Sequence, residues 1–251
     1  MTKLFLSTLM TACLAVSGAG SAAEIKVLAA GGMQPGLNAA AKVFRDKTAV
    51  EVKFTYEPPV DLGKRVAGGE AADLVVSSPA VIADLTKAGK VLADGQMHLG
   101  RVGVGVVARE AAPPPDVSSV QALKTSLIDA EAVVYNTASS GTYIEGMLKK
   151  IGVFDQIERK LVRLWDGTAV MHTLMEGRGR EFGFGGITDI LLYRDQGLRL
   201  VGPLPAEIQN YANYSAAVIS AAPNAEAAKA FVAYLASRDG RALFVANGIP
   251  E

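Results

Sequence analysis

The segment Asp73-Leu74-Val75-Val76-Ser77-Ser78-Pro79 joins a short apolar run to the start of a helix. An apolar run of this length predicts a buried strand, here from Asp73 to Ser77. Ser78 followed by Pro79 is a strong helix-start signal, because serine caps the first turn and proline fits within it. We expect that helix to reach about Lys87. A buried strand that passes directly into a helix is the building unit of an α/β fold.

The same alternation continues on both sides of this segment. A capping-box pattern, Thr142 with Glu145, predicts that one helix begins at Thr142, and Ser118 with Gln121 predicts another helix start. The alternation indicates an α/β fold with mostly parallel sheets flanked by helices. The other strands are predicted at 25–29, 50–56, 101–108, 132–135, 161–164, 182–185, 198–201 and 214–220, and the other helices at 37–47, 142–151, 225–236 and 238–246.

The chain of 251 residues is long enough for two α/β lobes of roughly 100 residues each. Its composition changes between Arg101 and Pro115 without a flexible linker. We therefore expect two strands to cross between the lobes, one near Val104 and one near Tyr214. Lobe 1 would comprise residues 24–103 and 216–251, and lobe 2 residues 104–215. Ligands of such folds bind in the crevice at the carboxyl ends of the strands.

The N-terminal segment 1–23 has the pattern of a secretion signal. Lys3 precedes an apolar run that ends at Val16, and the small residues Ser21 and Ala23 precede Glu24. The run is shorter than the ~20 residues of a membrane-spanning helix, so we predict a Sec signal peptide that is cleaved before Glu24. The alternative is lipoprotein processing at Cys13, which follows a poor lipobox.

Composition excludes several kinds of function. Lys and Arg together number 25, as do Asp and Glu, so the chain lacks the excess positive charge of a nucleic-acid binder. Cys13 is the only cysteine, and His98 and His172 are the only histidines, so we expect no metal centre and no cofactor. No nucleophile elbow, P-loop or zinc-protease motif occurs. The expected partner is a small molecule, and the expected state is a monomer.

Strand-to-helix junctions carry the candidate ligand-binding residues. Glycine lets a ligand approach the backbone, and hydroxyls and free N–H groups at a helix start bind anions. Tight turns, helix capping and a packed strand end are the alternative explanations. The candidates are Gly31, Gly32 and Met33 at the first junction, Ser77 and Ser78 at the second, Ser139, Ser140, Gly141, Thr142 and Tyr143 at the third, and Gly185 and Gly186 at the fourth.

A bound anion also calls for a positive side chain. Arg101 is the strongest candidate, because it opens the predicted crossing strand and because arginine binds carboxylates through two parallel hydrogen bonds. His172, on a predicted helix, is a candidate for acid–base chemistry, although a core or surface role is the simpler explanation. The other basic candidates are Lys64, Arg65, Arg109, Arg163, Arg178 and Arg180.

Four segments carry a family resemblance. They are Val27-Leu28-Ala29-Ala30 before a helix, Gly68 to Ser78 with Ala72-Asp73 at its centre, Gly141-Thr142-Tyr143, and Phe184 to Asp189. Together they resemble the periplasmic solute-binding proteins of ABC transporters, in the type II class that includes the molybdate-binding proteins. The resemblance covers nearly the whole chain after Glu24. It implies a two-lobed periplasmic receptor that closes on a small anion and delivers it to an ABC transporter permease.

The sequence departs from the molybdate-binding pattern at three places. Gly31-Gly32 stands where those proteins usually have a serine, Tyr56-Glu57-Pro58-Pro59 where they have a serine–glycine loop, and Gly186 where they have a tyrosine. Fewer oxyanion donors and more glycine imply a roomier cleft. We therefore expect an organic carboxylate as the ligand, and weak or no binding of molybdate and tungstate.

Two other functions stay open. Periplasmic aconitate isomerase resembles the same family, so an exported isomerase of an unsaturated carboxylate is the main alternative. Its candidate proton carriers are His172, Glu57, Tyr56 and Tyr143. A sensor that presents its ligand to a membrane protein is the third possibility. The resemblance favours a receptor, which needs no catalytic residues.

Overall fold

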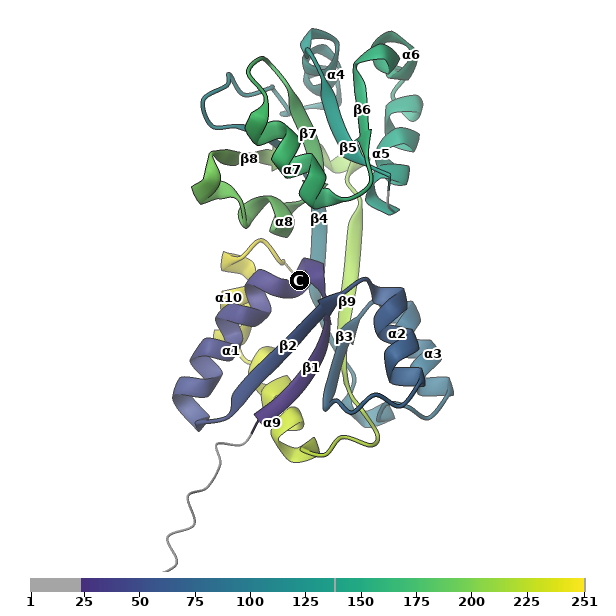
Figure 1. Cartoon of the computed structure of the whole chain (residues 1–251), viewed down its shortest axis with the longest axis vertical. Coiled ribbons are helices and arrows are strands. Elements are labelled where there is room, and N and C mark those ends of the chain that lie inside the picture. The colour runs from purple at the N-terminus through teal and green to yellow at the C-terminus, as the bar shows by residue number, and fades with distance from the viewer. Residues whose placement is uncertain (1–23, 138, 251) are drawn as a thin grey trace, which may run out of the picture.

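The computed structural model describes residues 24–137 and 139–250, and Figure 1 shows two lobes stacked along the longest axis of the molecule. The predicted signal peptide, with Cys13, lies outside the described residues. Two strands, β4 (Met97–Arg109) and β9 (Tyr211–Val218), run between the lobes. The hydrogen-bonded order of the strands is β2-β1-β3-β9-β4-β7-β5-β6, and β8 pairs with β4.

Lobe 1 contains the N-terminal strands, the first half of β4 and the C-terminal helices. Its other strands are β1 (Glu24–Ala30), β2 (Glu51–Glu57) and β3 (Leu74–Ser77). Its helices are α1 (Gln34–Thr48), α2 (Pro59–Ala67), α3 (Pro79–Lys87), α9 (Ala225–Ala236) and α10 (Arg238–Ala246). Strand β1 pairs in parallel with β2 and β3, so the carboxyl ends of all three strands lie at one edge of the sheet.

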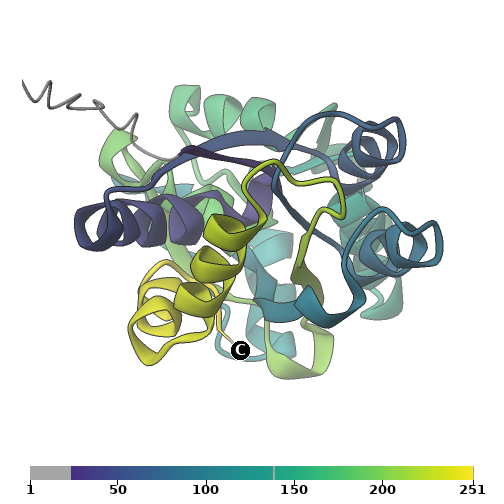
Figure 2. The same cartoon turned by 90° about the horizontal axis from the view of Figure 1, so that it is seen from below.

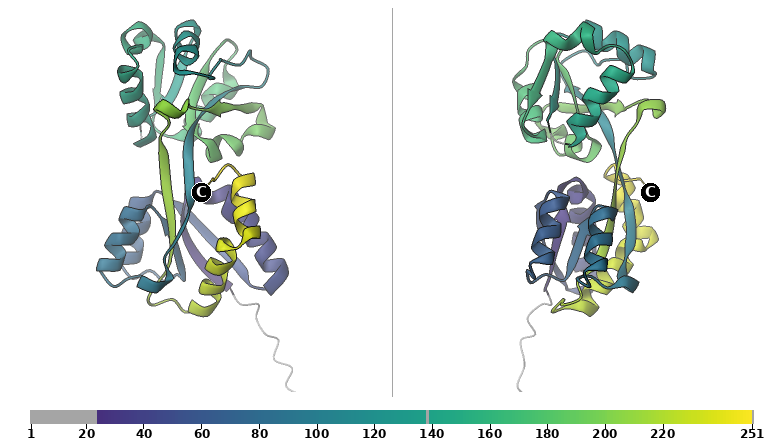
Figure 3. Two further views of the ribbon diagram at one scale, coloured as in Figure 1. Left: turned by 180° about the vertical axis from the view of Figure 1, so that it is seen from behind. Right: turned by 90° about the vertical axis from the view of Figure 1, so that its right-hand side faces the viewer.

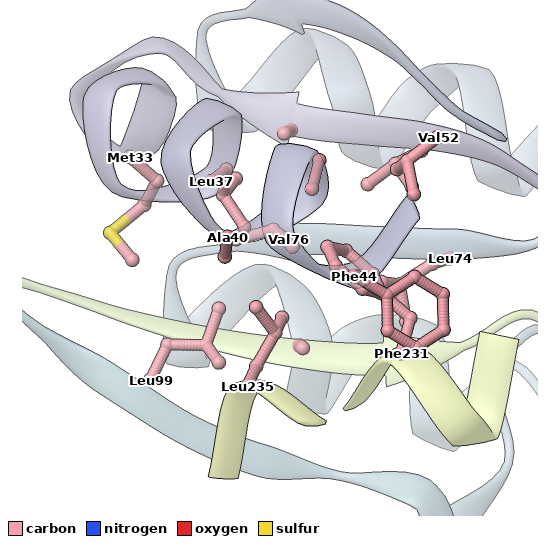
Figure 4. Packing of buried hydrophobic residues seen from close by; sticks show 14 of the residues in the cluster. Met33, Leu37, Ala40, Phe44, Val52, Leu74, Val76, Leu99, Phe231 and Leu235 are labelled. Atoms are coloured by element: carbon pink, nitrogen blue, oxygen red, sulfur yellow. The ribbon is translucent and has the colours of Figure 1, made fainter. Parts of the chain in front are cut away.

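The sheet of lobe 1 has an apolar layer on each face. Successive side chains of a strand point to opposite faces. Val27 and Leu74 therefore pack into one cluster with α1, α9 and α10, which Figure 4 shows, whereas Leu28 and Val75 pack into another with α2 and α3. Figure 2, seen from below, shows the two groups of helices on opposite sides of the sheet.

Lobe 2 is a second sheet sandwiched between helices. Val106 and Tyr135 pack on the face that α4 and α5 cover, and Val107 and Val134 pack on the face of α7 and α8. The strands are β5 (Val133–Asn136), β6 (Leu161–Leu164), β7 (Phe182–Gly186) and β8 (Leu198–Pro203). The helices are α4 (Val120–Asp129), α5 (Ser139–Lys150), α6 (Phe154–Ile157), α7 (Gly167–Glu176) and α8 (Ile187–Leu191).

The two lobes share β4 as a common strand. Its residues up to Gly103 pair antiparallel with β9 in lobe 1, and from Val104 onward it pairs with β7 and β8 in lobe 2. Tyr214 of β9 lies opposite Gly100 of β4. Figure 3 shows the two strands side by side across the waist of the molecule. Short 3₁₀ turns complete the chain: η1 (Gly31–Met33), η2 (Ala93–Gly95), η3 (Glu158–Lys160), η4 (Arg194–Gln196) and η5 (Ala206–Ile208).

The predicted α/β fold with two crossing strands is confirmed, but three helix starts were predicted wrongly. Helix α1 begins at Gln34, not at Leu37. Helix α5 begins at Ser139, not at Thr142. A Cβ on Gly141 would overlap the carbonyl oxygen of Asn136, so only glycine lets the helix start this close to β5. Glu145 is held by Lys149 and Arg163 instead of completing a capping box.

The start of helix α4 was also predicted wrongly. Its cap is Ser119, whose hydroxyl accepts the Ala122 N–H at 3.1 Å. Ser118 stands before the cap because its own N–H donates to Asp116 Oδ1 at 2.9 Å, which holds it in a turn.

Within the part of the chain that the structure describes, every helix is too short or too polar to cross a membrane.

Candidate functional site

A pocket of about 650 Å³ lies between the lobes, lined by residues from both of them. Most of these residues follow the carboxyl end of a strand: β1 and β2 in lobe 1, and β6 and β7 in lobe 2. This is where open α/β sheets bind their ligands. The lining residues are Ala30, Gly31, Gly32, Gln34, Tyr56, Glu57, Pro58, Pro59, Asp166, Gly167, Thr168, Met171, Asp189, Leu192, Tyr193 and Tyr214.

The wall after β1 is bare backbone. Gly31 and Gly32 form the η1 turn that leads into α1, and α1 starts without a side-chain cap. A Cβ on Gly32 would lie 2.8 Å from the Tyr214 hydroxyl, whereas a Cβ on Gly31 would have no neighbour within 4 Å. Glycine at position 32 thus lets the Tyr214 hydroxyl sit against the start of the helix.

The wall after β2 contains a carboxylate that is already neutralised. Glu57 forms an ion pair with Arg65, which also pairs with Glu70. The neighbouring Tyr56 hydroxyl donates to Asn38 Oδ1 at 2.8 Å. Burial raises the pKa of Tyr56, so this phenol stays protonated and acts as a neutral donor.

The lobe 2 wall is the start of α7. Asp166 caps this helix, because its Oδ1 accepts the Ala169 N–H at 2.7 Å. Gly167 and Thr168 follow in the first turn and also line the pocket. The sequence folds this way because aspartate is a preferred cap and its negative charge stabilises the positive end of the helix.

Asp189, in the first turn of α8, is the third carboxylate of the pocket. No hydrogen bond or ion pair to its carboxylate is found among the described residues. Its carboxylate lies against Gly186, where a Cβ would come within 2.9 Å of Oδ2. Burial raises the pKa of Asp189 to about 6. Burial, and then the charge of Asp189, raises the pKa of Tyr214 to about 12.

The pocket can bind an anion without a formal positive charge. Of the described residues, those that line it include no lysine, arginine or histidine. Its candidate donors are the backbone N–H groups of the η1 turn and of the first turn of α7, the Thr168 hydroxyl, and the hydroxyls of Tyr193 and Tyr214. Helix starts carry partial positive charge and free N–H groups, which bind anions. No group of three His, Cys, Asp or Glu side chains suited to a metal ion occurs in residues 24–137 and 139–250.

The lobe 1 candidates predicted from the sequence are divided between the pocket and the core. Gly31 and Gly32 line the pocket. Met33 is fully buried and points into the core of lobe 1, as Figure 4 shows. Ser77 is also buried, and its hydroxyl donates to the Pro59 carbonyl at 3.4 Å. Ser78 is the cap residue of α3, although its side chain makes no capping hydrogen bond.

The other candidates lie away from the lining of this pocket, and their contact with a ligand stays a prediction. Arg101 is exposed, with its guanidinium 4.2 Å from the centre of the Tyr211 ring. The Tyr143 hydroxyl donates to the Ile208 carbonyl at 2.6 Å. Gly185 is buried in β7, and Gly186 precedes α8. Gly141 is buried and Thr142 exposed in α5, and the side chains of Ser139 and Ser140 lie outside what the structure describes.

Most other charged candidates are occupied by partners of their own. Arg109 donates to the Gly179 carbonyl at 2.6 Å and pairs with Glu181. Arg163 pairs with Glu145 at 3.1 Å. His172 is exposed on α7 and stacks edge-on against Tyr193, with ring centres 6.1 Å apart.

Sequence reasoning missed Asp166, Thr168 and Tyr214 as site residues, and it weighed Asp189 only as a helix start. The junction at Asp166-Gly167-Thr168 had a readable signal, since an aspartate cap follows a predicted strand there. No such signal marks Asp189 and Tyr214, because these two residues come together only through the packing of α8 against the crossing strands.

Comparison with known proteins identifies the relatives of this chain. A family model described as bacterial extracellular solute-binding protein matches residues 25–249. An aconitate isomerase from a Pseudomonas species is 27% identical over 98% of this chain and 95% of its own length.

Solved structures with the same fold include two connected with molybdenum. The substrate-binding domain of a putative molybdenum ABC transporter from Clostridium difficile superposes with a TM-score of 0.75 at 20% identity, over 91% of this chain and 99% of that one. The periplasmic molybdate-binding protein of Azotobacter vinelandii superposes with a TM-score of 0.70 at 14% identity, over 90% and 99%. The predicted likeness to molybdate-binding proteins of the type II class is therefore confirmed at the level of the fold.

Proposed function

We propose, since this chain belongs to the family of bacterial extracellular solute-binding proteins, that it is a receptor that captures a small organic carboxylate between its lobes. One observation carries the proposal: strand-to-helix junctions from both lobes line a single pocket. A ligand that contacts both walls draws the lobes together, because closure adds contacts that the open form lacks. The closed receptor then delivers its ligand to an ABC transporter permease.

The donors of the pocket support an anionic ligand. The backbone at Gly31 and Gly32 and the first turn of α7 at Thr168 face it from opposite lobes. Hydrogen bonds to a charged group are worth about 1.5–3 kcal/mol each, so a few such donors hold an anion without an arginine. In this proposal the dipoles of these N–H and O–H groups, and not a charged side chain, neutralise the charge of the ligand.

The size of the pocket supports an organic ligand over a four-oxygen anion. A volume of about 650 Å³ lies within the range of about 300–1,000 Å³ of small-molecule sites. Gly31 leaves room where a molybdate site needs a side-chain donor, because a Cβ on Gly31 would have no neighbour within 4 Å. Molybdate and tungstate should therefore bind weakly or not at all.

Thermal unfolding of the purified protein with a panel of anions tests this proposal. The panel contains trans-aconitate, citrate and succinate, with molybdate, tungstate and sulfate as the inorganic set. A carboxylate present at a hundred times its Kd should stabilise the protein by about 2.7 kcal/mol, and the inorganic anions should not. Submicromolar binding of molybdate by calorimetry would contradict the choice of ligand.

We propose export to the periplasm as the location of this receptor, after cleavage of residues 1–23. The membership of the solute-binding family supports this location. Intact-mass measurement of the protein from the periplasmic fraction tests it, with a chain that begins at Glu24 as the expected result. A mass that includes residues 1–23 would contradict cleavage, and a lipid-modified Cys13 would favour the lipoprotein alternative.

A second candidate function, isomerisation of an unsaturated carboxylate, is favoured by two observations. The relative from Pseudomonas is named aconitate isomerase and matches nearly the whole chain. Asp189 lies in the pocket with a pKa of about 6, which suits a group that removes a proton from one carbon and returns it to another. Proton NMR of trans-aconitate after long incubation separates the two functions, because a receptor leaves the ligand unchanged whereas an isomerase converts it.

A further inference from the structure

We propose that Asp189 binds the ligand as a carboxylic acid, sharing one proton with a carboxylate of the ligand, so that capture of the ligand takes up a proton. This inference rests on the proposed function, since it concerns the same pocket and the same class of ligand. It assigns a binding role to a residue that the sequence marked only as the start of a helix.

Asp189 lies where a ligand held between the lobes can reach it. Its carboxylate lines the pocket and folds back against the backbone of Gly186, at the end of β7. Across the pocket, Tyr214 comes from the crossing strand β9, with its hydroxyl near Gly32 of lobe 1. The carboxylate therefore lies where lobe 2 meets the crossing strand, within reach of a ligand held between the lobes.

The charged and titratable groups that line the pocket leave the negative charge of Asp189 uncompensated. Glu57 from β2 is paired with Arg65, and Asp166 is engaged as the cap of α7. The remaining titratable groups of the pocket are the phenols Tyr56, Tyr193 and Tyr214. Of the described residues that line the pocket, none carries a positive charge to offset Asp189. A bound carboxylate would therefore meet an uncompensated negative charge.

Sharing a proton resolves this repulsion. Two carboxyl groups in contact cannot both stay ionised in a buried site, and one proton between them forms a strong O–H···O hydrogen bond. The proton comes from solvent and stays with the complex, so no bond of the ligand breaks and no redox change occurs. Burial already favours the protonated form of Asp189, since its pKa is about 6 before the ligand arrives. The second negative charge raises this pKa further.

Calorimetry with trans-aconitate tests the proposal, using the purified protein in two buffers that differ in ionisation enthalpy. The difference in heat gives the number of protons taken up on binding. At pH 7 we expect the wild type to take up nearly one proton more per bound ligand than D189N does. The wild-type Kd should also rise by up to tenfold per pH unit between the pKa of Asp189 in the free protein, about 6, and its higher pKa in the complex.

Two variants complete the test. D189N keeps the shape of the side chain and a donor, so it should bind trans-aconitate with a Kd that changes less than twofold between pH 6 and pH 8, after correction for ionisation of the ligand. D84N is the matched control, because it makes the same change at a carboxylate outside the pocket lining, with its side chain 79% exposed on α3. It should keep the proton uptake of the wild type.

The outcomes separate this inference from the proposed function. Binding of trans-aconitate by the wild type and D189N with the same proton uptake would overturn the role of Asp189 and leave the receptor standing. Failure of trans-aconitate, citrate and succinate to bind either protein between pH 5 and pH 8 would overturn both. Loss of uptake in D84N as well as in D189N would also contradict the assignment to Asp189.

Discussion

Asp73 is a buried carboxyl and Asp189 is a half-buried one that lines the pocket, and their surroundings give them opposite roles. Asp73 is 1% exposed, and its two oxygens accept the backbone N–H groups of Lys26 at 2.8 Å and Asn224 at 2.7 Å. It joins the first strand to the segment before α9. Among residues 24–137 and 139–250, no donor to the carboxylate of Asp189 is found, and Asp189 lines the pocket. The first carboxyl stabilises the fold, and the second is available to a ligand.

Replacing Asp73 by alanine should reduce the free energy of unfolding by about 2–5 kcal/mol. The change leaves two N–H groups in part-buried positions without an acceptor, and each costs about 1–3 kcal/mol. Urea denaturation followed by circular dichroism measures the loss. Asp84→Ala is the control, because Asp84 lies on the exposed face of α3 with its side chain 79% exposed, and it should change stability by less than about 0.5 kcal/mol. Equal losses in the two variants would contradict the role of Asp73.

Asp189 should make stability depend on pH. Burial raises its pKa from 3.8 to about 6 in the folded protein, so the folded state binds this proton more tightly than the unfolded state. The resulting stabilisation is complete below about pH 4 and is lost as the pH rises through about 6. D189N, which has no such titration, should therefore gain up to about 3 kcal/mol on the wild type between pH 4 and pH 7.5. Chemical denaturation of both proteins at the two pH values measures it, and a constant difference between them would refute the shift.

At the scale of elements, the sequence predicted the strand-to-helix junctions well and the direction of side chains poorly. Gly31 and Gly32 line the pocket because a glycine pair after a buried strand is readable in the sequence. Met33, one residue further on, turns into the core, since a helical turn rotates each successive side chain to a new face. The Tyr143 hydroxyl is likewise taken by the Ile208 carbonyl, a partner 65 residues away that no local pattern indicates.

Trp165, in the segment between β6 and α7, lies where its fluorescence can report closure of the lobes. Trp165 is the only tryptophan of the chain, it is 76% exposed, and it precedes the pocket residue Asp166. Val60, 64% exposed, follows the pocket residue Pro59 in lobe 1. Two exposed apolar side chains thus flank the pocket from opposite lobes, and closure would bring their surroundings together.

We therefore expect ligand binding to shift the fluorescence of Trp165 to shorter wavelength, because closure removes the indole from water. Titration of trans-aconitate against tryptophan emission measures the shift. Trp165→Phe should abolish the signal while changing the Kd from calorimetry by less than about threefold, which is below 1 kcal/mol. An emission spectrum that stays unchanged at saturating ligand would show that Trp165 does not take part in closure.

At the scale of the whole molecule, the arrangement of the strands allows two lobes to move on a fixed waist. Strand β4 changes its partners between Gly103 and Val104, and β9 lies beside it across the same level. Each lobe keeps its own apolar clusters on both faces of its sheet. Rotation about the waist therefore changes the pocket without disturbing either core, as in hinge closure around a ligand.

The sequence predicted this waist from the small-residue strand after Arg101, but not how the pocket is composed. Its lining comes from positions as distant as Gly31 and Tyr214, which approach one another only when both lobes are folded and joined. In the charge balance of the pocket, Arg65 neutralises Glu57, whereas none of the described residues forms an ion pair with Asp189, and this balance also depends on contacts between separate elements. Local patterns give positions along a strand or helix, whereas these contacts depend on the packing of the whole chain.

Small-angle X-ray scattering with and without a saturating organic carboxylate tests most directly whether this protein is a receptor that closes on its ligand. The measurement uses trans-aconitate at a concentration shown by calorimetry to saturate the protein, with sulfate at the same ionic strength as the control. We expect the radius of gyration to decrease with trans-aconitate and to stay constant with sulfate. A radius of gyration that does not change when the protein is saturated would contradict closure of the lobes around the ligand.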